Sequence, residues 1–143
     1  MRIGLMHSLD FSKEALGIKD ALENKGHEVS LCYSVQRVKD GNFSVEEIVD
    51  LKEKGNFSNY TISKDLIRWN WERLQKDDAI LVINLTKKGI TNYIGGNTLI
   101  EMGFAHVLHK KIFLWNDIPD MPYTDEIKAM QPMVINHDIG AIK

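Results

Sequence analysis

The sequence predicts an α/β fold built on one five-stranded parallel sheet, and three features of the chain indicate it. Short apolar runs alternate with segments of helical spacing along all 143 residues, which is typical of a parallel sheet covered by helices. The run 79–83 is apolar at every position, as in a strand that is buried on both faces. A glycine-rich loop, a long apolar segment at 99–109 and a further strand come after it, and together they form a βαβ unit. Because crossovers between parallel strands are right-handed, few arrangements remain, and we predict the strand order 2-1-3-4-5.

Each element has its own pattern in the chain. Strands are expected at 2–6, 27–33, 79–83, 112–115 and 133–135. Helices are expected at 13–25, 45–54, 63–76, 99–109 and 124–130. Gly26 stands where a helix ends in a left-handed residue. In the helix before the central strand, Ile67, Trp71 and Leu74 share one face, which we expect to pack on the sheet. Trp69 points elsewhere, either beneath the preceding segment or toward a second subunit.

The segment 34–60 carries the weakest pattern in the chain. Glycine and asparagine flank its single expected helix on both sides. It is either a lid over a site or a variable connection between two elements. We interpret it as a connection, because most connecting segments carry no chemistry.

Length and composition exclude several classes of protein. The chain is long enough for a single domain spanning 1–143 with one hydrophobic core, since 43% of its residues are hydrophobic. A net charge of −2 offers no basic surface for nucleic acid. No segment is long and apolar enough to serve as a signal peptide or to cross a membrane. The single cysteine, Cys32, lies in an apolar run that we interpret as strand core, and its isolation indicates a reduced, cytoplasmic setting.

Motifs for metals and common cofactors are missing, and we expect neither. The five histidines show no ligand spacing apart from His106 and His109, which lie three residues apart near a helix end and are interpreted as surface residues. Neither GxxxxGK[ST] nor GxGxxG comes after the first strand, which disfavours a P-loop or a dinucleotide site.

The predicted strand order brings two polar loops together at the carboxyl ends of the strands. The loops at 7–12 and 85–97 flank the point between strands one and three, where open α/β sheets bind ligands. The first loop offers backbone amides at a helix N-terminus and the hydroxyls of Ser8 and Ser12. These groups either bind a phosphate or carboxylate or merely cap the helix.

One carboxylate, Glu101, interrupts the apolar helix at 99–109, in its expected first turn. Two interpretations remain open, and they do not exclude each other. In the first, Thr98 and Glu101 form a capping box, in which the glutamate side chain returns to the N-cap amide. In the second, Glu101 is a reactive carboxylate facing the crevice beside the glycine loop.

The chain resembles the nucleoside 2-deoxyribosyltransferase family and its relatives, the 2′-deoxynucleoside 5′-phosphate N-hydrolases. The resemblance extends over almost the whole chain: Met6-His7-Ser8 after the first strand, ALENKGHEV, LQKDDAILVIN, and a glycine loop leading to Glu101-Met102-Gly103-Phe104-Ala105 and KKIFL. It implies a flavodoxin-like three-layer sandwich that cleaves or transfers the N-glycosidic bond of a (deoxy)nucleoside or nucleoside 5′-monophosphate. It also implies that Glu101 is the nucleophile and that the protein is a homo-oligomer whose neighbouring subunits complete the active sites.

The same resemblance places the substrate-binding residues and shows where this chain departs from the family. The candidate residues are His7, Ser8, Asn70, Gly95, Gly96 and Asn97. Ser8 matches a position that contacts a 5′-phosphate in the hydrolase branch. Asn70 replaces the family's aspartate, and Gly95 replaces an aspartate or serine, so neither position supplies a general acid. Substitute acids are Asp65, Asp117, Asp120 or His7. A binding module without catalysis, or a structural oligomer, is the alternative function.

Overall fold

The sheet has the predicted topology. The computed structural model describes residues 1–143. Its five strands are all parallel and are ordered β2-β1-β3-β4-β5. They span Arg2–His7 (β1), Glu28–Ser30 (β2), Ala79–Ile83 (β3), Lys111–Leu114 (β4) and Met133–Val134 (β5). This order confirms the predicted flavodoxin-like sheet. Strand β2 is added on one side of β1, and β3, β4 and β5 are added on the other side.

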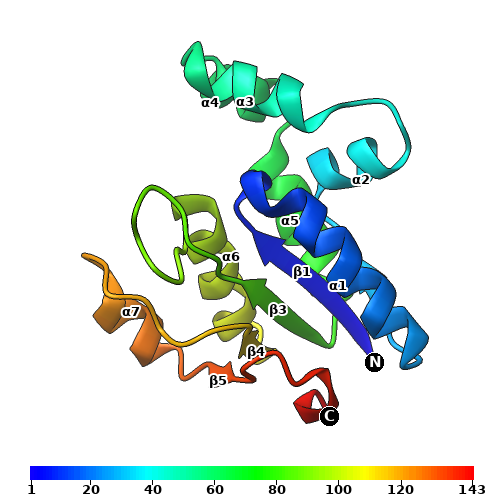
Figure 1. Ribbon diagram of the computed structural model, residues 1–143, viewed down its shortest axis with the longest axis vertical. Helices are drawn as coiled ribbons and strands as arrows, with labels where there is room; N and C mark the ends of the chain where they lie inside the picture. Colours follow the sequence, from blue (N-terminus) through cyan, green and yellow to red (C-terminus); the bar gives the residue numbers. More distant parts are fainter.

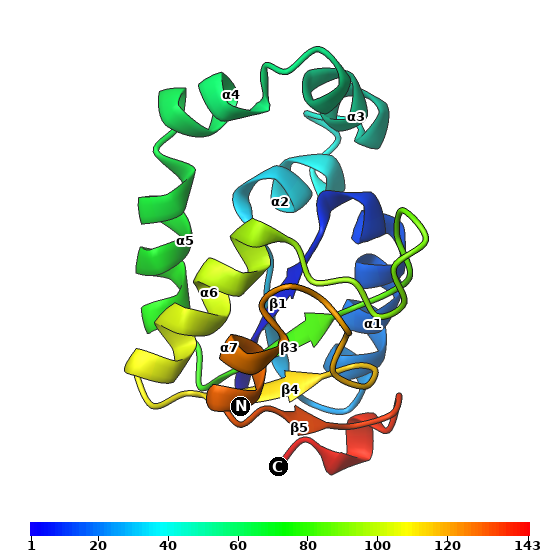
Figure 2. The ribbon, with the colours of Figure 1, turned by 90° about the vertical axis from the view of Figure 1, so that its left-hand side faces the viewer.

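Seven α-helices and two short 3-10 helices surround the sheet. The α-helices are α1 (Ser12–Asn24), α2 (Tyr33–Lys39), α3 (Val45–Glu53), α4 (Phe57–Ser63), α5 (Leu66–Gln75), α6 (Gly96–Val107) and α7 (Thr124–Ala129). The 3-10 helices are η1 (Leu9–Phe11) and η2 (Ile139–Ala141). Helix α1 lies on one side of the sheet, whereas α5 and α6 lie side by side on the other (Figure 2). The result is the expected three-layer sandwich.

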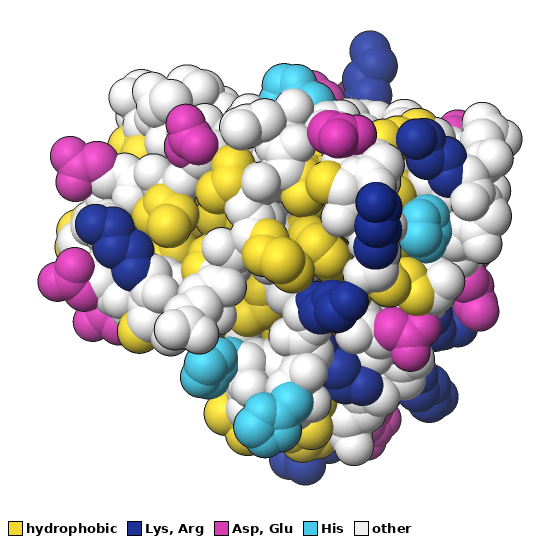
Figure 3. All heavy atoms as spheres, turned by 90° about the horizontal axis from the view of Figure 1, so that it is seen from below, with side chains coloured by type: hydrophobic (Ala, Val, Ile, Leu, Met, Phe, Trp, Pro, Cys, Tyr) yellow, Lys and Arg dark blue, Asp and Glu magenta, His cyan; other side chains and the backbone are white.

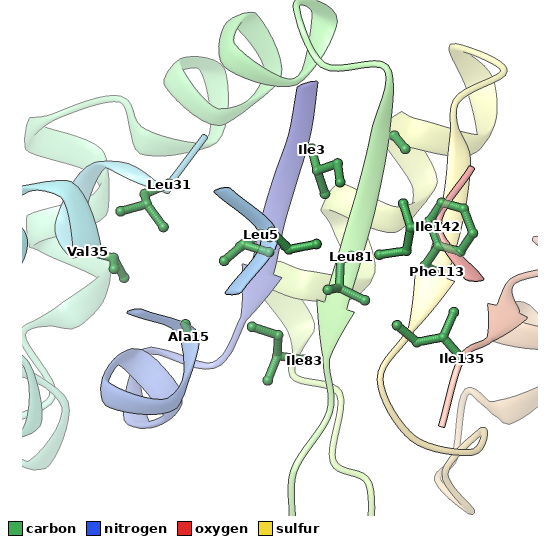
Figure 4. Packing of buried hydrophobic residues seen from close by; sticks show 12 residues of the cluster. Ile3, Leu5, Ala15, Leu31, Val35, Leu81, Ile83, Phe113, Ile135 and Ile142 are labelled. Atoms are coloured by element: carbon green, nitrogen blue, oxygen red, sulfur yellow. The ribbon is translucent and has the colours of Figure 1, made fainter. Parts of the chain in front are cut away.

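The alternation of side chains along β3 divides the core into two halves. Ala79, Leu81 and Ile83 point toward α1 and belong to a cluster with Ile3, Leu5 and Phe113, part of which Figure 4 shows. Ile80 and Val82 point to the opposite face, where they meet α5, α6 and α7. Every residue of β3 is therefore buried, as its unbroken apolar run predicts.

Helix α1 ends as its sequence predicts. Gly26 comes after the last turn with φ of 87°, in the left-handed region. The backbone amide of Gly26 donates to the carbonyl of Glu23 at 2.9 Å, and that of His27 donates to Leu22 at 3.2 Å. These two bonds form a Schellman motif, which satisfies the last carbonyls of the helix.

The segment after β2 differs from its prediction. The second strand ends at Ser30 instead of continuing to residue 33, and Cys32 is the N-cap of α2. The period of two fails there because Leu31 and Val35 enter the same core cluster, a spacing of four that fits a helix. The insertion contains three helices instead of one, and only α3 was predicted. Ser44 and Glu47 form a complete capping box at the start of α3.

Helices α3 and α4, residues 45–63, form what we call the arm. In Figures 1 and 2 the arm lies at the top of the molecule, beyond the carboxyl ends of β1 and β3. Asp65 adopts a left-handed backbone conformation, with φ of 47°, and so interrupts the helical conformation between α4 and α5. The arm therefore covers the end of the sheet where parallel α/β proteins bind ligands, which favours the lid over the simple connection expected from the sequence.

The face that α5 presents to the sheet was predicted only in part. Leu74 is buried as expected, but Ile67 is 48% exposed, and Leu66 and Arg73 are buried in its place. Leu66, Arg73 and Leu74 are seven and eight positions apart, so the buried residues still share one side of α5. Trp71 packs edge-on against Phe104 of α6, with ring centroids 5.1 Å apart.

Trp69 packs within the chain. Its ring contacts Tyr33, the first residue of α2, in a T-shaped arrangement with centroids 5.5 Å apart. Of the two alternatives for this residue, the structure shows packing against the neighbouring helix. No contact to a second subunit is needed to explain its position.

The face of the molecule opposite the arm carries a patch of hydrophobic side chains (Figure 3). In Figure 3, hydrophobic side chains gather in the middle of this face, and lysine, arginine, acidic and histidine side chains surround them.

None of the helices has both the length and the apolar character required to cross a membrane.

Candidate functional site

One cavity lies between the arm, α5, α6 and the carboxyl end of β1. Its volume is about 170 Å³, and side chains from β1, both polar loops, the start of α2, the arm, α5 and α6 line it. The proposed nucleophile and all the candidate substrate-binding residues are among them: Glu101, His7, Ser8, Asn70, Gly95, Gly96 and Asn97. The fold thus brings together residues that are as much as 94 positions apart, from His7 to Glu101.

Glu101 lines this cavity, and its carboxylate has no hydrogen bond to any group of the protein. Helix α6 begins one residue after Gly95, which is its N-cap, and no side chain caps it. The capping box with Thr98 is therefore wrong, because the glycines belong to the cap and the first helical turn. Glu101 consequently sits in the second turn, too far along the helix to reach the N-cap amide.

Burial sets the protonation of Glu101. Its side chain is only 6% exposed. Loss of hydration raises the pKa of Glu101 from 4.5 to about 7, although the positive charge of Arg73 acts in the opposite direction. Both protonation states are therefore populated at neutral pH, as in carboxyl groups that exchange protons during catalysis.

His7 is a neutral side chain at the edge of the same cavity. Its Nδ1 lies 2.8 Å from the carbonyl oxygen of Ser8, and burial lowers the pKa of His7 to about 4. The neutral ring must donate from Nδ1, which leaves Nε2 as an acceptor. Because the ring carries no positive charge at neutral pH, His7 is disfavoured as the substitute general acid.

Two of the cavity residues have a buried polar atom without a hydrogen-bond partner. Four buried side-chain atoms lack a hydrogen-bond partner, namely His7 Nε2, Asn70 Oδ1, Arg73 Nε and His27 Nδ1. The first two belong to residues that line the cavity, and Arg73 comes one turn after Asn70 in α5. Native structures leave few such atoms unpaired, so their concentration here is typical of a ligand site.

Two lysines that the sequence analysis did not select join the site. Lys87 donates to Ser8 Oγ at 2.8 Å and lies 2.7 Å from Asp10 Oδ2. Lys52, from the arm, reaches the other oxygen of Asp10 at 3.3 Å. Burial would raise the pKa of Asp10, but the hydrogen bond from Lys87 and both lysine charges hold it below its ordinary value. Ser8 thus contacts one lysine directly, and a second lysine is bound to the same aspartate.

Aromatic side chains form much of the remaining wall. Tyr33, Phe57, Tyr93 and Phe104 all line the cavity. At Gly95, an added Cβ would lie 3.3 Å from the ring of Tyr93, so the glycine permits close approach of this wall. Such surfaces favour planar, partly apolar ligands.

The other proposed acids lie elsewhere. Asp65, Asp117 and Asp120 are not among the cavity residues, and Asp65 pairs instead with Arg68 at 2.8 Å. Glu101 is therefore the sole carboxylate that lines the cavity. Cys32 also lines it, which corrects its expected place within a strand, and burial raises the pKa of its thiol. The structure contains no group of three or more potential metal ligands.

Comparison with known proteins gives little beyond this geometry. No family model and no curated sequence matches the chain. Among solved structures, a CMP N-glycosidase of Clostridium botulinum, BcmB, is similar to it. The two share 16% sequence identity over 95% of this chain and 90% of that one, with a TM-score of 0.46. A likeness of this degree carries no argument about the reaction or the site residues.

Proposed function

We propose that the protein cleaves or transfers the N-glycosidic bond of a nucleoside 5′-monophosphate, with Glu101 as the nucleophile. The observation that carries this proposal is a buried carboxylate without hydrogen bonds that faces a ligand-sized cavity. Folding leaves such a group there at a cost in free energy, because its charge loses hydration without gaining a partner. A function that needs the charge explains its retention.

The chemistry of glycosidic cleavage suits this carboxylate. The sugar develops positive charge at its anomeric carbon as the bond to the base lengthens. One oxygen of Glu101 attacks that carbon, and the electron pair of the broken C–N bond leaves with the base. Water or a second base then attacks the same carbon and releases the carboxylate. The ionised form of Glu101 performs the first step, and burial strengthens its attraction for the developing charge.

A phosphate group on the substrate is supported by the cations around Ser8. Lys87, Lys52 and Ser8 all line the cavity, and the Ser8 hydroxyl contacts Lys87. Charge-assisted hydrogen bonds of this kind bind phosphate strongly. Asp10 holds both lysines in the absence of ligand. A free nucleoside has no group that uses these cations.

The cavity also supports a second candidate, a binding module for nucleotides. Glu101 has no companion carboxylic acid among the lining residues, so the departing base must take its proton from water or from another subunit. A protein that holds the nucleotide without turnover needs no such donor. The homo-oligomer that the sequence resemblance implies stays a prediction, and a neighbouring copy is one source of the missing acid.

One experiment separates these candidates. Ribo- and deoxyribonucleoside 5′-monophosphates and the matching nucleosides are incubated with the protein, and free base is measured by chromatography. We expect release from a monophosphate, and we expect Glu101→Gln to reduce its rate by a factor of about 10³ or more. Glu72→Gln, which removes an exposed glutamate of α5, is the control and leaves the rate unchanged. Equal release by Glu101→Gln refutes the nucleophile, whereas tight binding without release favours the binding module.

A further inference from the structure

Arg73 is a buried cation that the proposed reaction does not use directly. It lies on α5, and only 7% of it is exposed. Its Nη1 lies 3.4 Å from Ser30 Oγ and its Nη2 lies 3.0 Å from Met6 Sδ, while Nε has no partner. A guanidinium has five N–H donors, so these weak contacts leave its charge poorly satisfied.

No carboxylate forms a direct ion pair with Arg73. The acid nearest to it through hydrogen bonds is Asp77, whose two carboxylate oxygens share the hydrogen of Ser30 Oγ, at 2.8 and 3.0 Å. Asp77 also accepts a hydrogen bond from Arg2 Nε at 3.1 Å. Asp77 therefore already has a cation of its own, and Arg73 reaches it only through the serine hydroxyl. Part of the Arg73 charge remains available to act elsewhere.

The arrangement of the elements directs this charge toward the cavity. Helices α5 and α6 lie side by side (Figure 2). Asn70, one turn before Arg73, lines the cavity. Met6, which contacts the guanidinium, packs in one buried cluster with Met102, the neighbour of Glu101 in α6. Arg73 is not among the residues that line the cavity, and it lies on the helix that packs against the helix of Glu101.

The other titratable groups around Glu101 do not supply a comparable charge. From β1, His7 is neutral because burial lowers its pKa to about 4. From the start of α2, Cys32 keeps its proton because burial raises its pKa. Lys52 of the arm and Lys87 of the glycine loop are both paired with Asp10. The Arg73 charge, by contrast, lowers the pKa of Glu101 against the effect of burial.

We propose that Arg73 is a positioning residue that acts through Glu101: its buried guanidinium, without an ion-pair partner, favours the ionised form of the carboxylate from outside the cavity lining. The electrostatic part of this inference needs no turnover, and its consequence for rate rests on the proposed function. A charge that never touches substrate preserves space in the cavity for the sugar. It also keeps Glu101 without a hydrogen bond, so both of its oxygens remain free to attack.

The test measures the pKa of Glu101 directly. Protein labelled with ¹³C at glutamate carboxyl carbons is titrated by NMR, and Glu101→Gln identifies the signal. Arg73→Met keeps a long buried side chain without charge, and we expect it to raise the pKa of Glu101 enough to reduce the ionised fraction at pH 7 several-fold. Arg73→Lys, which restores the charge, is expected to return it most of the way. Arg68→Met, which removes an exposed arginine of the same helix, is the control and leaves the signal unchanged.

If the enzyme turns over, the acidic limb of the pH profile of kcat/KM moves upward with the NMR value in Arg73→Met. An unchanged Glu101 titration in folded Arg73→Met overturns the inference. Equal shifts in the Met and Lys variants overturn it as well, because packing rather than charge would then be responsible. If Arg73→Met does not fold, the comparison of Arg73→Lys with Arg73→Gln decides in the same way. A protein without any turnover refutes the proposed reaction but leaves the NMR outcome valid.

Discussion

The burial of Glu101 makes the stability of the fold depend on pH, and Glu101→Gln isolates this dependence. The pKa of Glu101 is about 7 in the folded protein, compared with an ordinary value of 4.5. One pKa unit corresponds to about 1.4 kcal/mol, so ionising this group in the folded state costs about 3 kcal/mol more than in the unfolded chain. Glutamine has nearly the same shape and never ionises, so its folded state does not carry this cost.

The sign of the effect depends on where the proton is bound. Below about pH 4.5 both states of the wild type hold the proton, and Glu101 contributes no pH dependence. Between about pH 4.5 and 7 the unfolded chain releases the proton while the folded protein retains it, so stability falls as pH rises. Above about pH 7 both states are ionised and the loss is complete. Relative to wild type, Glu101→Gln therefore gains about 3 kcal/mol between pH 4 and pH 8.

Urea unfolding at pH 4, 5, 6, 7 and 8 measures this difference, provided that the slope with urea concentration is the same in both proteins. The comparison uses the change in the mutational difference with pH, so that any effect of the amide on packing cancels. Glu72→Gln is the matched control, because that glutamate is exposed; its difference stays small at every pH. A difference between Glu101→Gln and wild type that does not vary with pH refutes the burial argument.

Two further predictions concern the walls of the cavity. Lys87→Met is expected to raise KM for a nucleoside monophosphate by about 10-fold to 100-fold, the effect of losing one charge-assisted hydrogen bond. Lys88→Met, which changes the exposed neighbouring lysine, is the control and leaves KM unchanged. Equal effects of the two substitutions in steady-state kinetics contradict a phosphate site beside Ser8. Gly95→Ala is expected to weaken nucleotide binding measured by calorimetry several-fold, because the added methyl group lies 3.3 Å from the ring of Tyr93. Gly17→Ala in α1, where the added group meets nothing within 4 Å and which does not line the cavity, is the control.

The sheet and its order were predictable because each strand carries its own local signal. An unbroken apolar run such as 79–83 indicates a buried strand, and right-handed crossovers restrict the order in which the strands can pair. Helices α2 and α4 were not predicted, since each has only seven residues and too few turns to show a clear period. Their positions depend on contacts such as the one between Tyr33 and Trp69, which join distant parts of the chain.

The site was predictable to a similar extent. The predicted strand order brought the loops after β1 and β3 together, which pointed to Ser8, and a lone carboxylate in an apolar helix pointed to Glu101. His7 and Asn70 were selected through the family resemblance. Lys52 was not selected because it belongs to the arm, and no sequence pattern predicts that the arm lies over the end of the sheet. Lys87 lies in the glycine-rich loop itself, and a cation there beside a serine after the first strand was a signal that the sequence did contain.

Two residues of α5, Asn70 and Arg73, both favour a lower pKa of Glu101 than burial beside a second carboxylate would give. The family resemblance implies an aspartate at position 70, which would place a second negative charge at the same cavity. Like charges in one site raise the pKa of a carboxyl group further, and at Glu101 burial has already raised it to about 7. Asn70 removes that repulsion, and Arg73, one turn along the same helix, adds an attraction. Helix α5 thus supplies no carboxylic acid to the cavity, but Arg73 on it favours the ionised form of Glu101, which the proposed nucleophilic attack requires.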